Sequence, residues 1–266
     1  MAPGPAPVAL TIAGSDCSSG AGLQADLKTF SALGVFGLTA VTCVVAEVPG
    51  KVARIDAVNA ENVREQIELL LAHFPVAAIK TGLLYSPEIV EVVADVLASA
   101  GDIPLIIDPV MVATSGDVLL LPEAITTYRT RLFPRATLVT PNMAEAAVLC
   151  GMAVGNLEEM RRAGEELSSQ FGTQFLIKGG HLEGNEAVDL LCGGSEETEF
   201  SAPLVAGVDT HGTGCTYSAA ITARLAHGDD LHAAIACAKD FVSRAIEGYF
   251  TWTTPAGEVH ALNHQL

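Results

Sequence analysis

Short apolar runs alternate along the chain with longer segments whose apolar residues recur at a helical period. The apolar runs predict buried strands at residues 8–13, 38–45, 77–80, 105–107, 138–139 and 175–177. The longer segments predict helices at residues 23–33, 60–72, 88–100, 123–132 and 157–171. Such alternation is typical of right-handed βαβ units, in which helices cover both faces of a buried parallel sheet. We therefore expect an α/β fold of three αβα layers around a mostly parallel, doubly wound sheet.

The last third of the chain adds a hairpin and a glycine-rich loop. Residues 187–191 and 199–202 predict a short hairpin, and the alanine-rich stretch at 216–226 predicts a helix. No break in composition and no internal repeat divides the chain. We expect one domain over residues 8–266, with no separate lid domain, behind a flexible N-terminal tail over residues 1–7.

Composition and charge narrow the classes of partner. The net charge of -17 argues against nucleic acid, whose phosphate backbone needs basic partners. No apolar run reaches the ~18 residues of a membrane span, and no signal peptide precedes the first strand. The six cysteines include no C-x-x-C pair and no zinc-type spacing, which favours reduced thiols. We expect a cytoplasmic protein with neither a membrane nor a nucleic-acid partner.

Polar and glycine residues follow one predicted strand after another. In doubly wound sheets ligands bind at the carboxyl ends of the strands, so these residues should gather at one site. They occupy positions 14–26, 46–47, 81–83, 108–111, 115–117, 140–142, 145 and 178–181. The first of these loops lacks the dinucleotide-binding spacing, and no Walker A sequence is present.

Residues 209–215, D-T-H-G-T-G-C, run directly into a predicted helix. Glycines at a helix start leave backbone N–H groups exposed, and these groups with the helix dipole form a site for an anion such as phosphate. Cys215 lies beside this predicted anion site. A thiol at a helix start is expected to have a depressed pKa and to act as a base or nucleophile, although many such cysteines are inert. The residues alone leave both alternatives open.

Other strand-end residues have both a functional and a structural interpretation. Lys178 ends an otherwise apolar strand, where a cation is suited to phosphate. Asn142 and Glu145 offer oxygen ligands for Mg²⁺ or its waters, and they also match a helix capping box; the two roles are compatible. Asp26 either faces solvent on its helix or bonds a substrate hydroxyl group.

Five ordered motifs together resemble one known family. They are A-G-S-D-x-S-x-G-A-G-L-Q-A-D-L-K-T at 13–29, D-P-V-M-V-A-x-S-G-D at 108–117, T-P-N-x-x-E-A at 140–146, K-G-G-H at 178–181 and T-H-G-T-G-C-T at 210–216. The chain resembles the hydroxymethylpyrimidine/phosphomethylpyrimidine kinases of thiamine biosynthesis, which belong to the ribokinase-like superfamily.

The resemblance implies two successive phosphorylations of 4-amino-5-hydroxymethyl-2-methylpyrimidine, with ATP as co-substrate and Mg²⁺ as cofactor. It places at the pyrimidine Gly14, Ala21, Asp26, Val45, Glu47, Leu83 and Cys215, with Asp26 holding the hydroxymethyl oxygen. It assigns to ATP Lys178, Asn142, Thr210, Gly212 and Gly214. Asp108 and Glu145 would support the metal, directly or through water, and Gly212, Thr213 and Gly214 would form the anion hole.

In this family-based interpretation Cys215 is the base or the group that orients the substrate, and Lys178 acts with it in catalysis. The resemblance also favours a homodimer. The alternatives are a pyridoxal or pyridoxine kinase of the same superfamily and a ligand-binding relative without catalysis.

Two departures from the family pattern bear on the substrate. Ser18-Ser19 replaces a usual glycine pair, which should stiffen the first loop. Glu47 replaces a usual glutamine, and a carboxylate only accepts hydrogen bonds where an amide also donates. Glu47 therefore suits a protonated ring nitrogen beside the 4-amino group, or else a different pyrimidine. Residues 48–51 also differ, so the covering flap is expected to differ.

Overall fold

The computed structural model describes residues 4–111, 120, 122–180, 182, 184–194, 197–205, 208, 211–255 and 257–265. Thr210, predicted to bind ATP, lies outside the described residues. So do His181 and the 115–117 segment of the second motif.

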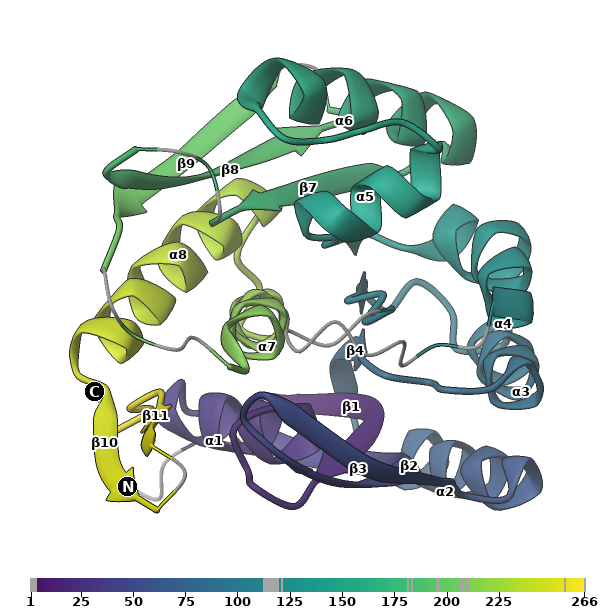
Figure 1. Cartoon of the computed structure of the whole chain (residues 1–266). Coiled ribbons are helices and arrows are strands. Elements are labelled where there is room, and N and C mark those ends of the chain that lie inside the picture. Colours follow the sequence, from purple (N-terminus) through teal and green to yellow (C-terminus); the bar gives the residue numbers. More distant parts are fainter. Residues whose placement is uncertain are drawn as a thin grey trace.

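A nine-stranded sheet forms the middle layer (Figure 1). Its strand order is β3-β2-β1-β4-β5-β6-β7-β8-β9, and the six strands from β2 to β7 in this order are parallel. At one edge β3 pairs antiparallel with β2, and at the other β8 and β9 pair antiparallel with β7 and β8. The strands are β1 Val8–Asp16, β2 Phe36–Val48, β3 Lys51–Ala57, β4 Val76–Thr81, β5 Leu105–Ile107, β6 Leu138–Val139, β7 Gln174–Gly179, β8 Glu186–Cys192 and β9 Thr198–Pro203.

Helices cover both faces of this sheet, which confirms the predicted three-layer fold (Figure 1). One face carries α1 Gly22–Ala32, α7 Thr213–Ala226 and α8 Leu231–Glu247. The other carries α2 Ala60–His73, α3 Pro87–Leu97, α4 Pro122–Thr127, α5 Met143–Cys150 and α6 Leu157–Phe171. Two short helical turns, Tyr128–Leu132 and Phe133–Arg135, follow α4.

The core follows the period-two alternation of the strands. In β1, Leu10 and Ile12 pack into the cluster beneath α2 and α3, whereas Ala9 packs with Phe30 and Ala219 beneath α1 and α7. Strands buried on both faces read as continuous apolar runs, which is why their positions were predictable.

The predicted elements agree with the structure except at its edges. The bounds of β5, β6 and α6 match the prediction. The sequence analysis did not predict β3, α8 or the small antiparallel sheet of β10 Phe250–Thr254 and β11 Gly257–Ala261. These strands are exposed and lack a buried apolar run. Among the described residues, none of the helices has the length and apolar character that a bilayer crossing requires.

The sheet has one switch point, between β1 and β4. The chain passes from β1 to β2 on one side and then returns to form β4 on the other side of β1. Ligands of doubly wound sheets bind at such a point, outside the carboxyl ends of the strands.

An aromatic group anchors the face covered by α6. Phe133 is fully buried, and its ring lies 5.2 Å from Phe171 and 5.8 Å from both Tyr128 and Phe175 between ring centroids. Phe133→Ala should lower the free energy of unfolding by about 3–5 kcal/mol in urea denaturation. Phe36→Ala, at a position that is 55% exposed, is the control, and equal losses would contradict this view of the core.

Candidate active site

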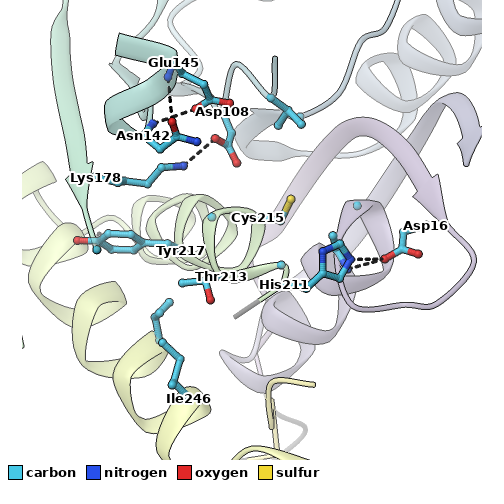
Figure 2. Close-up of a pocket in the computed structure, with 18 of the residues that line it drawn as sticks. Asp16, Asp108, Asn142, Glu145, Lys178, His211, Thr213, Cys215, Tyr217 and Ile246 are labelled. Carbon is cyan, nitrogen blue, oxygen red and sulfur yellow. Dashed lines mark hydrogen bonds and ion pairs between the residues drawn. The ribbon is translucent and has the colours of Figure 1, made fainter. Parts of the chain in front are cut away.

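A pocket extends along the carboxyl ends of β1, β4 and β7 and over the first turn of α7 (Figure 2). Asp16 and His211 lie at one end, Tyr217 and Ile246 at the other, and Cys215 between them. The end near Asp16 also contains the residues predicted to contact the pyrimidine, Gly14, Ala21, Val45, Glu47 and Leu83. The other predicted residues that line the pocket are Asp108, Asn142, Glu145, Lys178, Gly212, Thr213, Gly214 and Cys215.

The first turn of α7 is placed by a glycine contact. Gly212 has φ +84, and a Cβ there would lie 1.8 Å from the carbonyl oxygen of Gly20. Only glycine permits this approach, which joins the loop before α7 to the loop after β1. The N–H of Thr216 donates to the Gly212 carbonyl at 2.9 Å, so the N–H groups of Gly214 and Cys215 precede the intrahelical ladder. This is the geometry that the predicted anion hole requires.

Lys178 and Asp108 form an ion pair beside that turn. Lys178 Nζ lies 3.0 Å from Asp108 Oδ1, and the Ser218 hydroxyl of α7 donates to Asp108 Oδ2 at 3.2 Å. A Cβ at Gly214 would lie 3.0 Å from Lys178 Nζ, so glycine lets the ammonium approach the helix start. Burial alone would lower the pKa of Lys178, but Asp108 and Glu145 raise it above its ordinary value. Lys178 is therefore a charged group at the anion hole.

Asn142 and Glu145 form the predicted capping box at the start of α5. Asn142 Oδ1 accepts from the Glu145 N–H, and Glu145 Oε2 accepts from the Asn142 N–H, both at 2.9 Å. Glu145 Oε1 also accepts from the Met111 N–H at 3.0 Å, which fixes the chain just after Asp108. Burial raises the pKa of Glu145, against the opposing effect of Lys178. The structural interpretation of this pair is thus confirmed.

The same residues fit a magnesium ion that is held mainly by phosphate. Asp108 and Glu145 place two buried carboxylates beside Lys178, and both line the pocket. Mg²⁺ is usually bound through one or two carboxylates, with substrate phosphates and waters completing its shell. The donor set suits this mode of binding, and the metal role of Asp108 and Glu145 stays a prediction.

Cys215 differs from its expected ionisation. Burial, Asp108 and Asp26 raise the pKa of its thiol to about 12, although Lys80 and a hydrogen bond from the Gly22 N–H oppose the rise. The prediction of a depressed pKa at the helix start is therefore wrong, because loss of hydration outweighs the helix-start effect here. In the free protein Cys215 is a neutral thiol rather than a thiolate.

Asp26 also differs from its expected position. Its side chain is fully buried and does not line the pocket, and its carboxylate accepts from Thr11 Oγ1 at 2.6 Å and from Lys80 Nζ at 2.8 and 2.9 Å. The group that lines the pocket in its place is Lys80. Because Asp26 is fully buried behind Lys80, its contact with the hydroxymethyl oxygen stays a prediction that this geometry does not support.

Asp16 organises the end of the pocket that is predicted to bind the pyrimidine, and it was not among the predicted site residues. Its carboxylate accepts from the N–H groups of Ser18 and Ala21, from Ser18 Oγ, and from His211 Nε2 at 3.3 Å. Burial would raise the pKa of Asp16, but these hydrogen bonds, His211 foremost, lower it to about 2. Ser18 thus ties the first loop, as the replaced glycine pair led us to expect.

Glu47 lies within this network. One ligand atom from each of Asp16, Glu47 and His211 falls within 4.8 Å of the others. Burial and the neighbouring Asp16 raise the pKa of Glu47, against a smaller opposing effect of His211. Asp16 and His211 both lie inside the motifs that resemble the kinase family. Those motifs are the sequence signal that could have identified the two residues as part of the site.

The far end of the pocket is apolar with one ion pair. Val205, Val242 and Ile246 line it. Lys239 Nζ lies 2.6 Å from Asp189 Oδ2, and Asp189 Oδ1 accepts from the Gly179 N–H at 3.0 Å. This pair therefore fixes the backbone directly after Lys178. No strand-end motif marks Asp189 or Lys239, since neither follows a parallel strand.

A doubly wound sheet, a glycine-rich helix start at its switch point and a charged lysine beside that turn are the features of a small-molecule kinase of ribokinase-like fold. Comparison with known proteins supports this class. The family model for phosphomethylpyrimidine kinase matches residues 16–260, and the chain belongs to that family.

Curated relatives cover nearly the whole chain. A hydroxymethylpyrimidine/phosphomethylpyrimidine kinase of Bacillus subtilis is 41% identical over 240 residues, 90% of this chain and 89% of the relative. One of Streptomyces coelicolor is 45% identical over 245 residues, 92% of this chain and 90% of the relative.

Solved structures show the same fold. A Bacillus subtilis pyridoxal kinase in complex with ADP has TM-score 0.89 at 36% identity and covers 98% of each chain. A phosphomethylpyrimidine kinase of Clostridium difficile has TM-score 0.79 at 38% identity and covers 90% of this chain and 99% of its own.

The raised pKa of Cys215 predicts slow alkylation. With iodoacetamide at pH 8, Cys215 should react at least about 100-fold more slowly than the exposed Cys17 and Cys237, since only the thiolate attacks. Mass spectrometry of each peptide gives the rates, which for Cys215 should keep rising to pH 10. A plateau for Cys215 below pH 8 would show a thiolate and contradict this assignment.

The Gly212 contact predicts a sharp loss of activity on substitution. Gly212→Ala should lower ATP-dependent turnover by at least about 100-fold, because the first turn of α7 must move away from Gly20. Gly34→Ala is the matched control, since Gly34 also has positive φ but has open space around it. Similar turnover in the two variants would mean that the contact does not place the site.

Proposed function

We propose that this chain uses ATP to phosphorylate 4-amino-5-hydroxymethyl-2-methylpyrimidine and then its monophosphate. The observation that carries the proposal is the continuous pocket that joins the Glu47 end to an apolar end across the first turn of α7, with Lys178 at the crossing. The apolar end suits the adenine base, and the Glu47 end suits the flat aminopyrimidine ring. A phosphoryl group passing between them meets the N–H groups of Gly214 and Cys215.

Alignment and charge neutralisation account for most of the chemistry. Phosphoryl transfer has a loose transition state with charge spread over the phosphoryl oxygens, so the protein gains most by holding donor and acceptor in line. Lys178 and the helix-start N–H groups stabilise that charge. Bound Mg²⁺ would neutralise phosphate charge near Asp108 and Glu145. Cys215, as a neutral thiol, orients the hydroxymethyl group but takes up no further proton, and the alcohol proton passes to an oxygen of the transferred phosphoryl group as the new P–O bond forms.

Glu47 fits an aminopyrimidine in spite of its departure from the usual glutamine. The ring nitrogen accepts a hydrogen bond, and the adjacent 4-amino group donates one. A carboxyl group that keeps its proton can donate to the ring nitrogen through one oxygen and accept from the amino group through the other. Burial and Asp16 raise the pKa of Glu47, which favours retention of that proton. The pair is lost when Glu47 and the ring are both deprotonated.

Glu47→Gln tests this recognition through pH. In the unaltered protein the KM for the pyrimidine should rise with pH as the shared proton is lost, because the raised Glu47 pKa is then exceeded. In Glu47→Gln the amide needs no proton, so the KM should stay level over the same range. Parallel pH profiles for the two proteins would remove Glu47 from ring recognition.

A second function, phosphorylation of pyridoxal, is favoured by one observation. Pyridoxal kinases of Bacillus subtilis and Staphylococcus aureus match the fold with TM-scores of 0.89 and 0.88. Pyridoxal is also a flat heterocycle with a hydroxymethyl group. A screen of ATP consumption with the pyrimidine alcohol, its monophosphate and pyridoxal separates the two functions. We expect turnover of both pyrimidines, and turnover of pyridoxal alone would refute the proposal.

Cys215→Ala should lower kcat for the pyrimidine alcohol by about 100-fold while the KM changes little, since the thiol orients the hydroxymethyl oxygen for attack. Cys237→Ala, at an exposed position of α8, is the matched control and should retain full turnover. Stopped-flow or coupled assays of ADP release give both constants. An unchanged kcat in Cys215→Ala would exclude the thiol from orienting the hydroxymethyl group.

A further inference from the structure

Two lysine–aspartate pairs, one partly and one fully buried, flank the first turn of α7. Lys178 pairs with Asp108 on the side of Asn142 and Glu145. Lys80 pairs with Asp26 of α1 beneath the pyrimidine end, with Nζ 2.8 Å from Oδ1 and both side chains fully buried. The function proposed above uses Lys178 and leaves Lys80 without a role.

Lys80 is a buried lysine of the pocket wall whose ammonium has more N–H donors than its recorded contacts use. An ammonium carries three N–H donors, and the recorded partner of Lys80 among the described residues is the Asp26 carboxylate. Lys80 also lines the pocket, and Gly82 lies directly beside it, since a Cβ there would be 3.4 Å from Lys80 Nζ. Glycine at this position places no side chain against the ammonium.

The charge of Lys80 is secured by its surroundings. Burial would lower the pKa of Lys80, but Asp26 in particular, with Cys215 and Asp108, raises it. Thr11 donates a further hydrogen bond to Asp26 and so holds the counter-ion in place. The pair thus presents a fixed cation at the switch point between β1 and β4.

The two transfers differ in the charge that the acceptor brings into the pocket. The pyrimidine alcohol is neutral, whereas its monophosphate carries a phosphate into a pocket that already contains Asp108, Glu145 and the ATP phosphates. A buried anion of this kind requires its own cation. Besides Lys178, the lysines of the pocket wall are Lys80 and Lys239, and Lys239 lies at the apolar end with Asp189.

We propose that Lys80, held by Asp26, binds the phosphate of the pyrimidine monophosphate when that phosphate is the acceptor of the second transfer. An oxygen of the bound phosphate forms a bond to the γ-phosphorus of ATP, and the bond from that phosphorus to the β–γ bridging oxygen breaks as ADP leaves. The attacking oxygen is already ionised, so no proton must be removed. The inference rests on the proposed two-step function.

The test compares both acceptors in a charge-neutral variant. Lys80→Met alone leaves Asp26 buried and unpaired, so the variant to measure is Lys80→Met combined with Asp26→Asn, with its melting temperature recorded. We expect kcat/KM for the monophosphate to fall by about 100-fold and that for the alcohol by less than about 10-fold. Lys80→Arg, which keeps the positive charge, should lower kcat/KM for the monophosphate less than the double variant does. Lys28→Met, which removes an exposed charge of α1, is the control and should affect neither acceptor.

Binding of the monophosphate by calorimetry gives a readout that does not depend on turnover. Its Kd should rise by about 100-fold in the double variant, while the Kd of the alcohol stays within about 10-fold. Equal losses for both acceptors, or a monophosphate Kd that does not change, would overturn the inference. If the unaltered protein phosphorylates neither pyrimidine, the proposed function itself fails. If it phosphorylates the alcohol alone, only the role of Lys80 fails.

Discussion

The site depends on the close contact between Gly212 and Gly20. This contact brings the start of α7 against the loop after β1, although the two loops are almost two hundred residues apart in sequence. A Cβ at position 212 would lie 1.8 Å from the Gly20 carbonyl oxygen, so the contact exists only with glycine. It sets the N–H groups of Gly214 and Cys215 at the sheet's switch point. The ring end, the phosphate-binding turn and the apolar end of the pocket are all positioned relative to that turn.

Burial decides the chemistry of the groups around the turn. Lys178 and Lys80 stay charged because each has an aspartate at hydrogen-bond distance. For Cys215 the opposing effects of Lys80 and the Gly22 N–H are too small, and burial raises the pKa of its thiol to about 12. The site therefore offers two fixed cations and a neutral thiol. This arrangement suits a reaction in which charge must be neutralised and no enzyme-bound covalent intermediate is formed.

Periodicity and strand-end position predicted most of the fold and the site. Buried parallel strands such as β5 read as apolar runs, and the residues that follow them were found by their position alone. The sequence could not show that Asp26 is buried, because a single carboxylate on a helix carries no sequence pattern that indicates its ion pair with Lys80. Lys80, however, ends an apolar strand just as Lys178 does, so the argument applied to Lys178 would have found it. The pKa of Cys215 required the burial that only the structure supplies.

The most direct test of this account is a crystal structure of the protein with a non-hydrolysable ATP analogue and the pyrimidine alcohol. The account predicts the γ-phosphate within about 3 Å of the N–H groups of Gly214 and Cys215. It also predicts Lys178 on the phosphates, the ring against Glu47 and the adenine between Val205 and Val242. A γ-phosphate bound away from the first turn of α7, or a ring at the apolar end, would contradict it.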